Sequence, residues 1–526
     1  MIARLAACAC LGIAGLAVLP AAAAADGELD PGFGTGGAVT ISWGPGVGSE
    51  AVSSIAVLGD GRIVGSGMGA GNGVGVVRLT PAGVPDPTFA SGGQFYAKAA
   101  PSGFSGFGGA AFAPDGTATV GGFYFDMGGF ESFAMRVTPA GELDPAFGND
   151  PPNATGDGIV MYDIGGTHDQ VRSVALDPAG RTYLSGHTGD NTAGGANDAY
   201  VARLGGDGAL DTSLGGTGFV LTNAGTDDRG LGALFDASGN LLVAGSIDGQ
   251  LSVLRYRPDG SLDPGFGGGD GIAPVGLGTQ TPEIASLALQ PDGRIVLAAS
   301  TGAPFNFEFG VARLLPDGAQ DPSFAGDGSL TMEIGQSAFV SDVAIADDGR
   351  IVLAGTVTGS GDDQVALLRL LPNGTPDPQF GEGGLVFLGT ADAWEGGSAV
   401  AIQPDRKIVV GASWFDGASA DAQVMRVLGD TYAPDTKITK AKRKVKRKRK
   451  TKIRFQVVGD VNARFECSLK QPGKKGKKHK KFKPCTSPYR KKVKRKGKHT
   501  FRVRAIDPAG NVDPTPAKKR FRVKAR

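Results

Sequence analysis

One sequence unit recurs seven times along this chain of 526 residues. Each copy joins a Leu-Asp-Pro-x-Phe-Gly type of turn, an apolar stretch, an Asp-Gly-Arg type of hairpin turn and a stretch that resembles Val-Ala-Arg-Leu. The turn aspartates, 52 to 67 residues apart, are Asp30, Asp86, Asp144, Asp211, Asp263, Asp321 and Asp377. The arginines of the last stretch are Arg78, Arg136, Arg203, Arg255, Arg313, Arg369 and Arg426. A repeat of this length predicts a ring of like units and not a single wound domain.

Each unit contains four segments of strand length. In the fifth unit, residues 283–289 and 294–298 flank a Gln-Pro-Asp-Gly turn, in which glycine supplies the positive φ that a tight hairpin needs. Residues 309–314 and 329–334 are the third and fourth segments. Many positions hold Gly or Ala where an exposed sheet would hold polar residues, so we expect sheets covered on both faces. Four strands per unit predict propeller blades, and seven units predict an all-β, seven-bladed β-propeller over residues 26–430.

The strand after the first turn, residues 38–42, has no unit of its own to complete. We expect it to pair beside residues 422–426, because this pairing closes the ring and covers an exposed edge strand. Six turns carry a phenylalanine that is predicted to pack between blades: Phe33, Phe89, Phe147, Phe266, Phe324 and Phe380. The fourth turn has Leu214 instead, and the seventh hairpin, Asp405-Arg406-Lys407, lacks the usual glycine.

The first 25 residues have the composition of a secretory signal peptide. A single early charge, an apolar run and five alanines before Asp26 predict cleavage after Ala25 and a secreted or surface-associated protein. No other apolar stretch approaches the ~20 residues of a membrane-spanning helix. Cleavage would leave two cysteines, Cys467 and Cys485, which we expect to form a disulfide in an oxidising compartment. The alternative is a metal site, for which two cysteines supply too few ligands.

Charge divides the chain into two parts. Residues 431–526 contain 36 Lys and Arg against 5 Asp and Glu, a net charge of +31, whereas the preceding residues carry −29. Apolar and polar residues alternate at 453–458, 463–469, 500–505 and 520–524. This alternation predicts a small two-sheet sandwich over residues 451–526, preceded by a basic linker or first strand at 431–450.

The lysine-rich runs of this tail predict binding to an anionic polymer at the cell surface. Nucleic acid is another candidate partner, because Lys and Arg bind phosphate whatever carries it. The candidate residues are Lys442, Arg443, Lys444, Lys446, Arg447, Lys448, Arg449, Lys450, Lys474, Lys475, Lys477, Lys478, Lys480 and Lys481. We expect these runs to form an exposed edge or loops, where dense charge discourages pairing between sheet edges.

The repeated unit resembles the delta-60 repeat, a bacterial β-propeller repeat similar in layout to the NHL repeat. The tail resembles bacterial Ig-like modules of exported proteins through Phe-Glu-Cys-Ser-Leu at 465–469, Pro-Cys-Thr-Ser-Pro at 484–488, His-Thr-Phe at 499–501 and Asp-Pro-Ala-Gly-Asn-Val-Asp at 507–513. Neither resemblance implies an established enzymatic activity or supplies catalytic residues.

Two functions from different classes follow. The first is a non-enzymatic, monomeric scaffold without a cofactor, whose propeller displays loops to a partner. The second is an exported hydrolase or lyase with carboxylates at the central channel. Histidine chemistry is confined to His168 and His187, of which His168 is expected in an exposed loop. Gly-Asp-Gly loops at Asp157, Asp270 and Asp327 could offer oxygens to Ca²⁺, although turn formation is the simpler interpretation. Buried carboxylates clustered at the channel would favour the enzymatic function. A channel lined only by backbone and small residues would favour the scaffold function.

Overall fold

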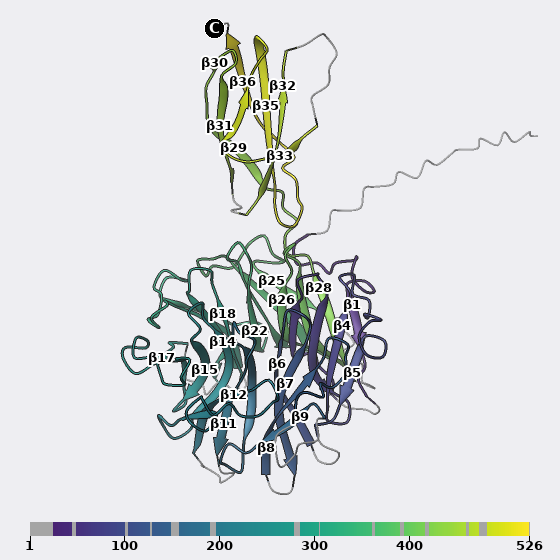
Figure 1. The fold of residues 1–526 in the computed structure, drawn as a ribbon, viewed down its shortest axis with the longest axis vertical. Helices are drawn as coiled ribbons and strands as arrows, with labels where there is room; N and C mark the ends of the chain where they lie inside the picture. Colours follow the sequence, from purple (N-terminus) through teal and green to yellow (C-terminus); the bar gives the residue numbers. More distant parts are fainter. Residues whose placement is uncertain are drawn as a thin grey trace, which may run out of the picture.

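The computed structural model describes residues 25–44, 49–99, 104–126, 129–148, 157–189, 196–277, 284–303, 306–359, 363–389, 394–415, 420–458, 462–472 and 481–524. Every regular element in these ranges is a β-strand (Figure 1), as the all-β prediction requires. Within the same ranges, no helix has the length and apolar character needed to cross a membrane.

The first part of the chain folds into seven four-stranded antiparallel sheets, counted over the described residues. Sheet 1 contains β2 (Ser54–Val57), β3 (Ile63–Gly69), β4 (Gly73–Leu79) and β5 (Gln94–Ala97); sheet 2 contains β6 (Phe104–Phe112), β7 (Ala118–Asp126), β8 (Gly129–Val137) and β9 (Ile159–Tyr162); sheet 3 contains β10 (Gln170–Leu176), β11 (Thr182–Gly189), β12 (Asn197–Leu204) and β13 (Phe219–Thr222); sheet 4 contains β14 (Arg229–Phe235), β15 (Leu241–Ile247), β16 (Gln250–Tyr256) and β17 (Ile272–Pro274). Sheet 5 contains β18 (Ala285–Leu289), β19 (Ile295–Ala303), β20 (Asn306–Leu314) and β21 (Ser329–Met332); sheet 6 contains β22 (Ser337–Ile345), β23 (Ile351–Thr358), β24 (Gln364–Leu370) and β25 (Leu385–Leu388); sheet 7 contains β26 (Trp394–Ile402), β27 (Ile408–Phe415), β28 (Ala420–Val427) and β1 (Ala38–Ile41).

The sheets form a closed ring, as in a β-propeller. The first strands contact one another in the cycle β2, β6, β10, β14, β18, β22, β26 and back to β2. β1 completes sheet 7 by pairing antiparallel with β28, in a register that places Ala38 opposite Met425 and Ile41 opposite Ala422. The prediction that the first strand joins the last sheet is therefore confirmed. The pairing covers an edge that an open ring would expose.

The predicted hairpins also form. β18 pairs with β19 across the turn at Gly293, whose φ is +83°, and the equivalent glycines Gly61, Gly116 and Gly349 also have positive φ. Fully covered sheets account for the many small residues: a Cβ added at Gly75, for example, would lie 2.0 Å from the Trp43 ring. The fourth strand of the fifth unit is shorter than predicted, because β21 ends at Met332.

The repeated Arg, Asp and Phe form a clamp between neighbouring sheets. In every copy the arginine Nε donates to the turn aspartate over 2.7–2.9 Å. In six copies the guanidinium also lies 4.4–4.8 Å from the centre of the turn phenylalanine ring. The same arginine donates to a carbonyl of the next sheet; the seven acceptors are Pro139, Gly206, Pro258, Pro316, Pro372, Gly429 and Pro81.

The six phenylalanines are fully buried, which confirms that they pack in the core and do not form a ligand platform. In the fourth turn, where Leu214 replaces phenylalanine, the guanidinium of Arg203 lies 5.8 Å from the Tyr183 ring and donates to its hydroxyl. A tyrosine from β11 therefore takes over the aromatic contact. Since the most regular residues of the repeat hold the ring together, they do not indicate a ligand site.

The irregular seventh hairpin contributes to the junction with the tail. Arg406 takes the place of glycine with φ +65° and is almost fully buried. Its guanidinium contacts Asp430, at 2.7 Å, and Asp347, at 2.8 Å. From the tail, Asn462 donates to Asp347 and Asn511 donates to the carbonyl of Asp430. The departure from the repeat thus places a cation where the ring meets the tail.

The tail contains two sheets that share one hydrophobic core. A three-stranded sheet has the order β29 (Asp435–Ala441), β31 (Lys450–Val458) and β34 (Tyr489–Lys492). A five-stranded sheet has the order β30 (Lys444–Lys446), β36 (Ala517–Lys524), β35 (Gly497–Ile506), β32 (Arg464–Lys470) and β33 (Lys483–Cys485). Phe455, Phe501 and Phe521 are among the buried residues between the sheets. Cys467 and Cys485 form the predicted disulfide.

Candidate functional site

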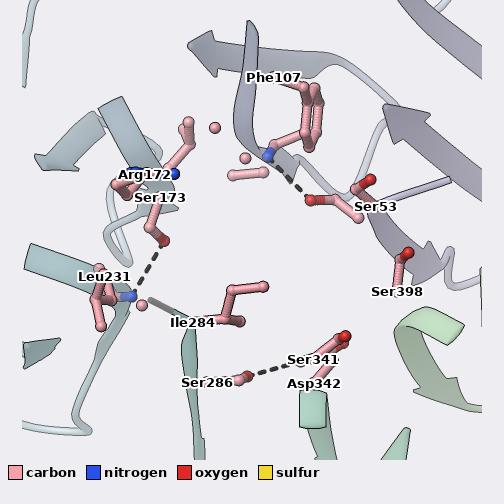
Figure 2. A pocket seen from close by; sticks show the side chains of 18 of the residues that line it. Ser53, Phe107, Arg172, Ser173, Leu231, Ile284, Ser286, Ser341, Asp342 and Ser398 are labelled. Atoms are coloured by element: carbon pink, nitrogen blue, oxygen red, sulfur yellow. Dashed lines mark hydrogen bonds between the residues drawn. The ribbon is translucent and has the colours of Figure 1, made fainter. Parts of the chain in front are cut away.

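The axis of the ring contains a cavity of about 560 Å³ that every sheet helps to line (Figure 2). Its walls come from the first strands, several of which carry a β-bulge at this level, as at Arg172, Ser341 and Ser398. Figure 2 shows Ser53 and Ser398 on one side of the cavity and Arg172 on the other. A bulge redirects a side chain out of the regular alternation, which places these residues on the channel wall.

Short side chains on the wall tie adjacent sheets together. At equivalent positions, an oxygen accepts a backbone N–H from the first strand of the next sheet; the pairs are Ser54 with Ala110 (3.1 Å), Ser173 with Ala233 (3.1 Å) and Asp342 with Val400 (2.8 Å). Gly109 and Gly232 occupy this position in two of the other sheets. The channel wall is therefore itself an inter-sheet contact.

Asp342 is the one carboxylate among the described residues that line this cavity. It accepts hydrogen bonds from the Ser286 hydroxyl, at 2.7 Å, and from the amides of Val343 and Val400, each at 2.8 Å. Burial raises the pKa of Asp342 in spite of these bonds. Sequence reasoning did not single out this residue, although it stands where Ser54 and Ser173 stand in other units.

Other buried carboxylates secure the loops that lead into the first strands. Glu50 accepts the amide of Trp43 at 2.8 Å, and Asp169 accepts the amide of Ile164 at 2.6 Å. Burial raises the pKa of both carboxyls. Asp228, at the matching position before β14, accepts amides in the same way. These groups lie in different sheets and bind their own loops, so they do not form the carboxylate cluster that an acid–base site requires.

The aspartates of the Gly-Asp-Gly loops make turns. Asp157 accepts the amide of Ile159, Asp270 that of Ile272, and Asp327 that of Ser329, each two residues along the chain. This bond is the Asx turn expected of such sequences. Across the described ranges, no three His, Cys, Asp or Glu side chains gather as a metal site would require.

Of the two ring histidines, His168 forms a β-bridge with Phe130 of β8, in sheet 2, and His187 lies in β11, in sheet 3. His168 is half-buried and its ring packs 4.7 Å from that of Phe130, so the prediction of an exposed loop is only partly right. His187 is 5% exposed. Burial, followed by the positive charges of Arg172 and Arg229, lowers the pKa of His187 to about 3.

His187 should make the ring less stable as the pH falls. The unfolded chain binds a proton near pH 6.5, whereas the folded chain keeps His187 neutral until its pKa of about 3, so stability is lost across this interval. Between about pH 7.5 and 5.5 the loss should be about 1.4 kcal/mol. We expect the thermal midpoint of the ring, measured by tryptophan fluorescence, to fall less over this pH interval in the His187→Asn variant than in the wild type. An unchanged fall in the variant would contradict the assignment.

The described anion-binding candidates of the tail lie on an edge strand, at the start of β31 and in turns, and Lys481 is also described. Lys444 and Lys446 are on the edge strand β30, Lys450 begins β31, and Lys442, Arg443, Arg447, Lys448 and Arg449 are in the adjoining turns. Lys481 is exposed. Lys474, Lys475, Lys477, Lys478 and Lys480 lie outside the described residues.

A second set of cations on the five-stranded sheet was not among the predicted binding residues. The alternation of β35 and β36 puts Phe501 and Phe521 in the core, so that Lys498, Arg520 and Arg522 lie on the outer face. Lys498 is directly opposite Arg522, and Thr500 is opposite Arg520. The alternation in the sequence was the available signal, but the cross-strand pairing that groups these residues requires the fold.

The β-propeller of DUF5122, a domain of unknown function, matches residues 58–89, 180–214, 237–266, 290–324 and 346–380. Each match runs from a hairpin turn to the next Asp-Pro type of turn, and together they cover less than half of the chain. None of the curated proteins matches the sequence.

The solved structures that match this chain have low identity and low TM-scores. The extracellular domain of a hybrid two component system, BT3049 from B. thetaiotaomicron, is 10% identical with a TM-score of 0.32; the alignment covers 93% of this chain and 57% of that chain. The polysaccharide lyase Uly1 is 12% identical with a TM-score of 0.40, over 74% of this chain and 92% of that chain. The chain thus spans little more than half the length of the first of these structures.

Proposed function

We propose that this chain is an exported, non-enzymatic binding protein. In this proposal a seven-bladed propeller of delta-60 type presents its loops to a partner, and an Ig-like tail holds the protein to an anionic polymer at the cell surface. The signal-like first 25 residues and the disulfide support an extracellular location.

The observation that carries the proposal is the uncompensated positive charge of the tail. Residues 431–526 contain 36 Lys and Arg against 5 Asp and Glu, and one of these acids, Glu466, forms a salt bridge with Arg504 at 2.7 Å. On the outer face of β31, the neighbouring cations Arg454 and Arg490 lower the pKa of Lys452. Repulsion among the many like charges of the tail as a whole opposes its folding, and a polyanion bound to any face of the tail would reduce this repulsion.

The enzymatic alternative has less support. Asp342 is the carboxylate of the channel wall, and its oxygens already accept bonds from Ser286, Val343 and Val400. A catalytic carboxylate needs access to a substrate proton or atom. This one ties sheets 5, 6 and 7 together.

The test is a titration of the full chain with inorganic polyphosphate between about 50 and 200 mM salt. If the tail contacts four phosphates at once, affinity should fall about 50-fold over this range, because bound polymer releases its condensed counterions. Absent or salt-insensitive binding would reject the proposal that the tail holds the protein to an anionic polymer.

A further inference from the structure

The five-stranded sheet of the tail carries a groove of about 790 Å³ on its outer face. Lys519 and Phe521 are among the residues that line it, and we use the name basic groove for the other six: Arg443, Lys498, Thr500, Lys518, Arg520 and Arg522. No acidic residue is among the described residues that line it. None of its five cations makes an ion pair within the described part of the chain.

The fold, and not a run of lysines in the sequence, builds this groove. Arg520 and Arg522 are two residues apart on β36, so both side chains lie on the same face, about 7 Å apart along the strand. Lys498 is directly opposite Arg522 on β35. Arg443 is held next to them because its carbonyl accepts the amide of Arg522 at 2.9 Å. The cations thus form rows on a rigid sheet.

The chemistry of the groove restricts its ligand. Lysine and arginine side chains are hydrogen-bond donors only, and Thr500 contributes the one side-chain acceptor of the groove. Phe521 is the aromatic residue at the groove, and it is 4% exposed. Because the groove offers no exposed ring for stacking and only the Thr500 hydroxyl as a side-chain acceptor for sugar hydroxyls, it suits a polymer whose contacting atoms are all acceptor oxygens.

We propose that the basic groove is the binding track of the tail and that its ligand is a linear phosphodiester polymer, recognised through its backbone alone. The guanidinium forks of Arg520 and Arg522 match two phosphate oxygens each, and Lys498 and Lys518 supply point charges beside them. This inference rests on the proposed function, since it names the face and the polymer of the same tether.

The opposite sheet supplies a matched control. Lys452, Arg454 and Arg490 are exposed on the three-stranded sheet, where Lys452 is opposite Arg490. The triple variant Lys452→Gln, Arg454→Gln, Arg490→Gln removes one lysine and two arginines, as does Lys498→Gln, Arg520→Gln, Arg522→Gln in the groove. All six side chains are exposed, so both variants should unfold at nearly the wild-type temperature.

The experiment titrates each full-length protein with a glycerol phosphate oligomer. Loss of three phosphate contacts should reduce the slope of log affinity against log salt by about 2 in the groove variant, and weaken binding about 100-fold near 0.1 M salt. The control variant should lose less than about tenfold. Equal losses of affinity in the two variants would overturn the assignment of the binding site to the basic groove. Binding would then depend only on the net charge of the tail. No binding of the glycerol phosphate oligomer by a wild type that binds polyphosphate would overturn the phosphodiester assignment, whereas no binding of either polymer would reject the proposed function itself.

Two further ligands test the chemistry. An abasic oligodeoxynucleotide with the same number of phosphates should bind as tightly as the glycerol phosphate oligomer, which would support recognition of the phosphodiester backbone from either source. Tighter binding of a base-containing strand would overturn recognition by the backbone alone. Equal or tighter binding of polygalacturonate with the same number of charges would overturn the assignment to phosphate.

Discussion

Replacing Arg369 by leucine should lower the free energy of unfolding of the ring by about 3–5 kcal/mol. Arg369 is the most buried of the clamp arginines, with 2% of its side chain exposed, and it contacts Asp377 and Asp26, each at 2.9 Å and each 1% exposed. It also donates to the carbonyl of Gly429. Its removal would leave the Asp26 carboxylate buried without a cation, and this uncompensated charge is the main source of the cost.

The same clamp between sheets 2 and 3 gives a matched control. Arg136 and Asp144 have the same geometry, but their side chains are 17% and 20% exposed, so Arg136→Leu should cost only about 1 kcal/mol. Adding Asp26→Asn to Arg369→Leu should restore part of the lost stability, because Asp377 keeps its ion pair with Arg350, at 3.1 Å, and no buried anion near the site then lacks a cation. Urea unfolding followed by tryptophan fluorescence would measure these effects, since all three tryptophans are in the ring and Trp43 is buried. Similar costs for the two arginine variants would contradict the role of burial.

The repeat made the architecture of the ring predictable. A strong local signal, an Asp-Gly hairpin between two short apolar segments, returns in each unit and determines which strands pair. The closing strand could be predicted by counting strands against turns, and its register with Met425 and Ala422 agrees with that count. The phenylalanines were predictable because a large apolar side chain at a fixed turn position must be buried between neighbours.

Contacts between distant segments were less predictable. At Arg406 the sequence showed only that the seventh hairpin lacks its glycine. The ion pairs of Arg406 could not be predicted, because Asp347 and Asp430 come from another sheet and from the end of the ring. Apart from Arg443, the residues of the basic groove were missed, because the groove depends on the pairing of β35 with β36, which no local pattern specifies. The nearly consecutive cations at 442–450 are recognisable in the sequence as a charged segment. The cations of β35 and β36 are not, because apolar residues separate them.

Replacing Cys467 and Cys485 by alanine should destabilise the tail by about 3 kcal/mol and leave the ring nearly unchanged. The disulfide spans 18 residues, and closing a loop of this length removes about that much unfolded-chain entropy. It also connects β32 to β33, the edge strand of the same sheet, which has three residues and pairs only with β32 in the described structure. The tail is small enough that 3 kcal/mol is a large share of its stability.

Hydrogen exchange measured by mass spectrometry can follow the two parts of the full chain separately. Peptides from β32 and β35 should exchange faster in the double variant, while peptides from sheets 1 to 7 and the tryptophan fluorescence transition should match the wild type. The ring provides the internal control, because it shares the solvent and the chain but not the disulfide. Faster exchange throughout the ring would mean that the junction at Arg406 and Asp430 couples the two parts into one cooperative unit. Unchanged exchange in the tail would show instead that the shared core around Phe455 and Phe501 holds the sheets without the cross-link.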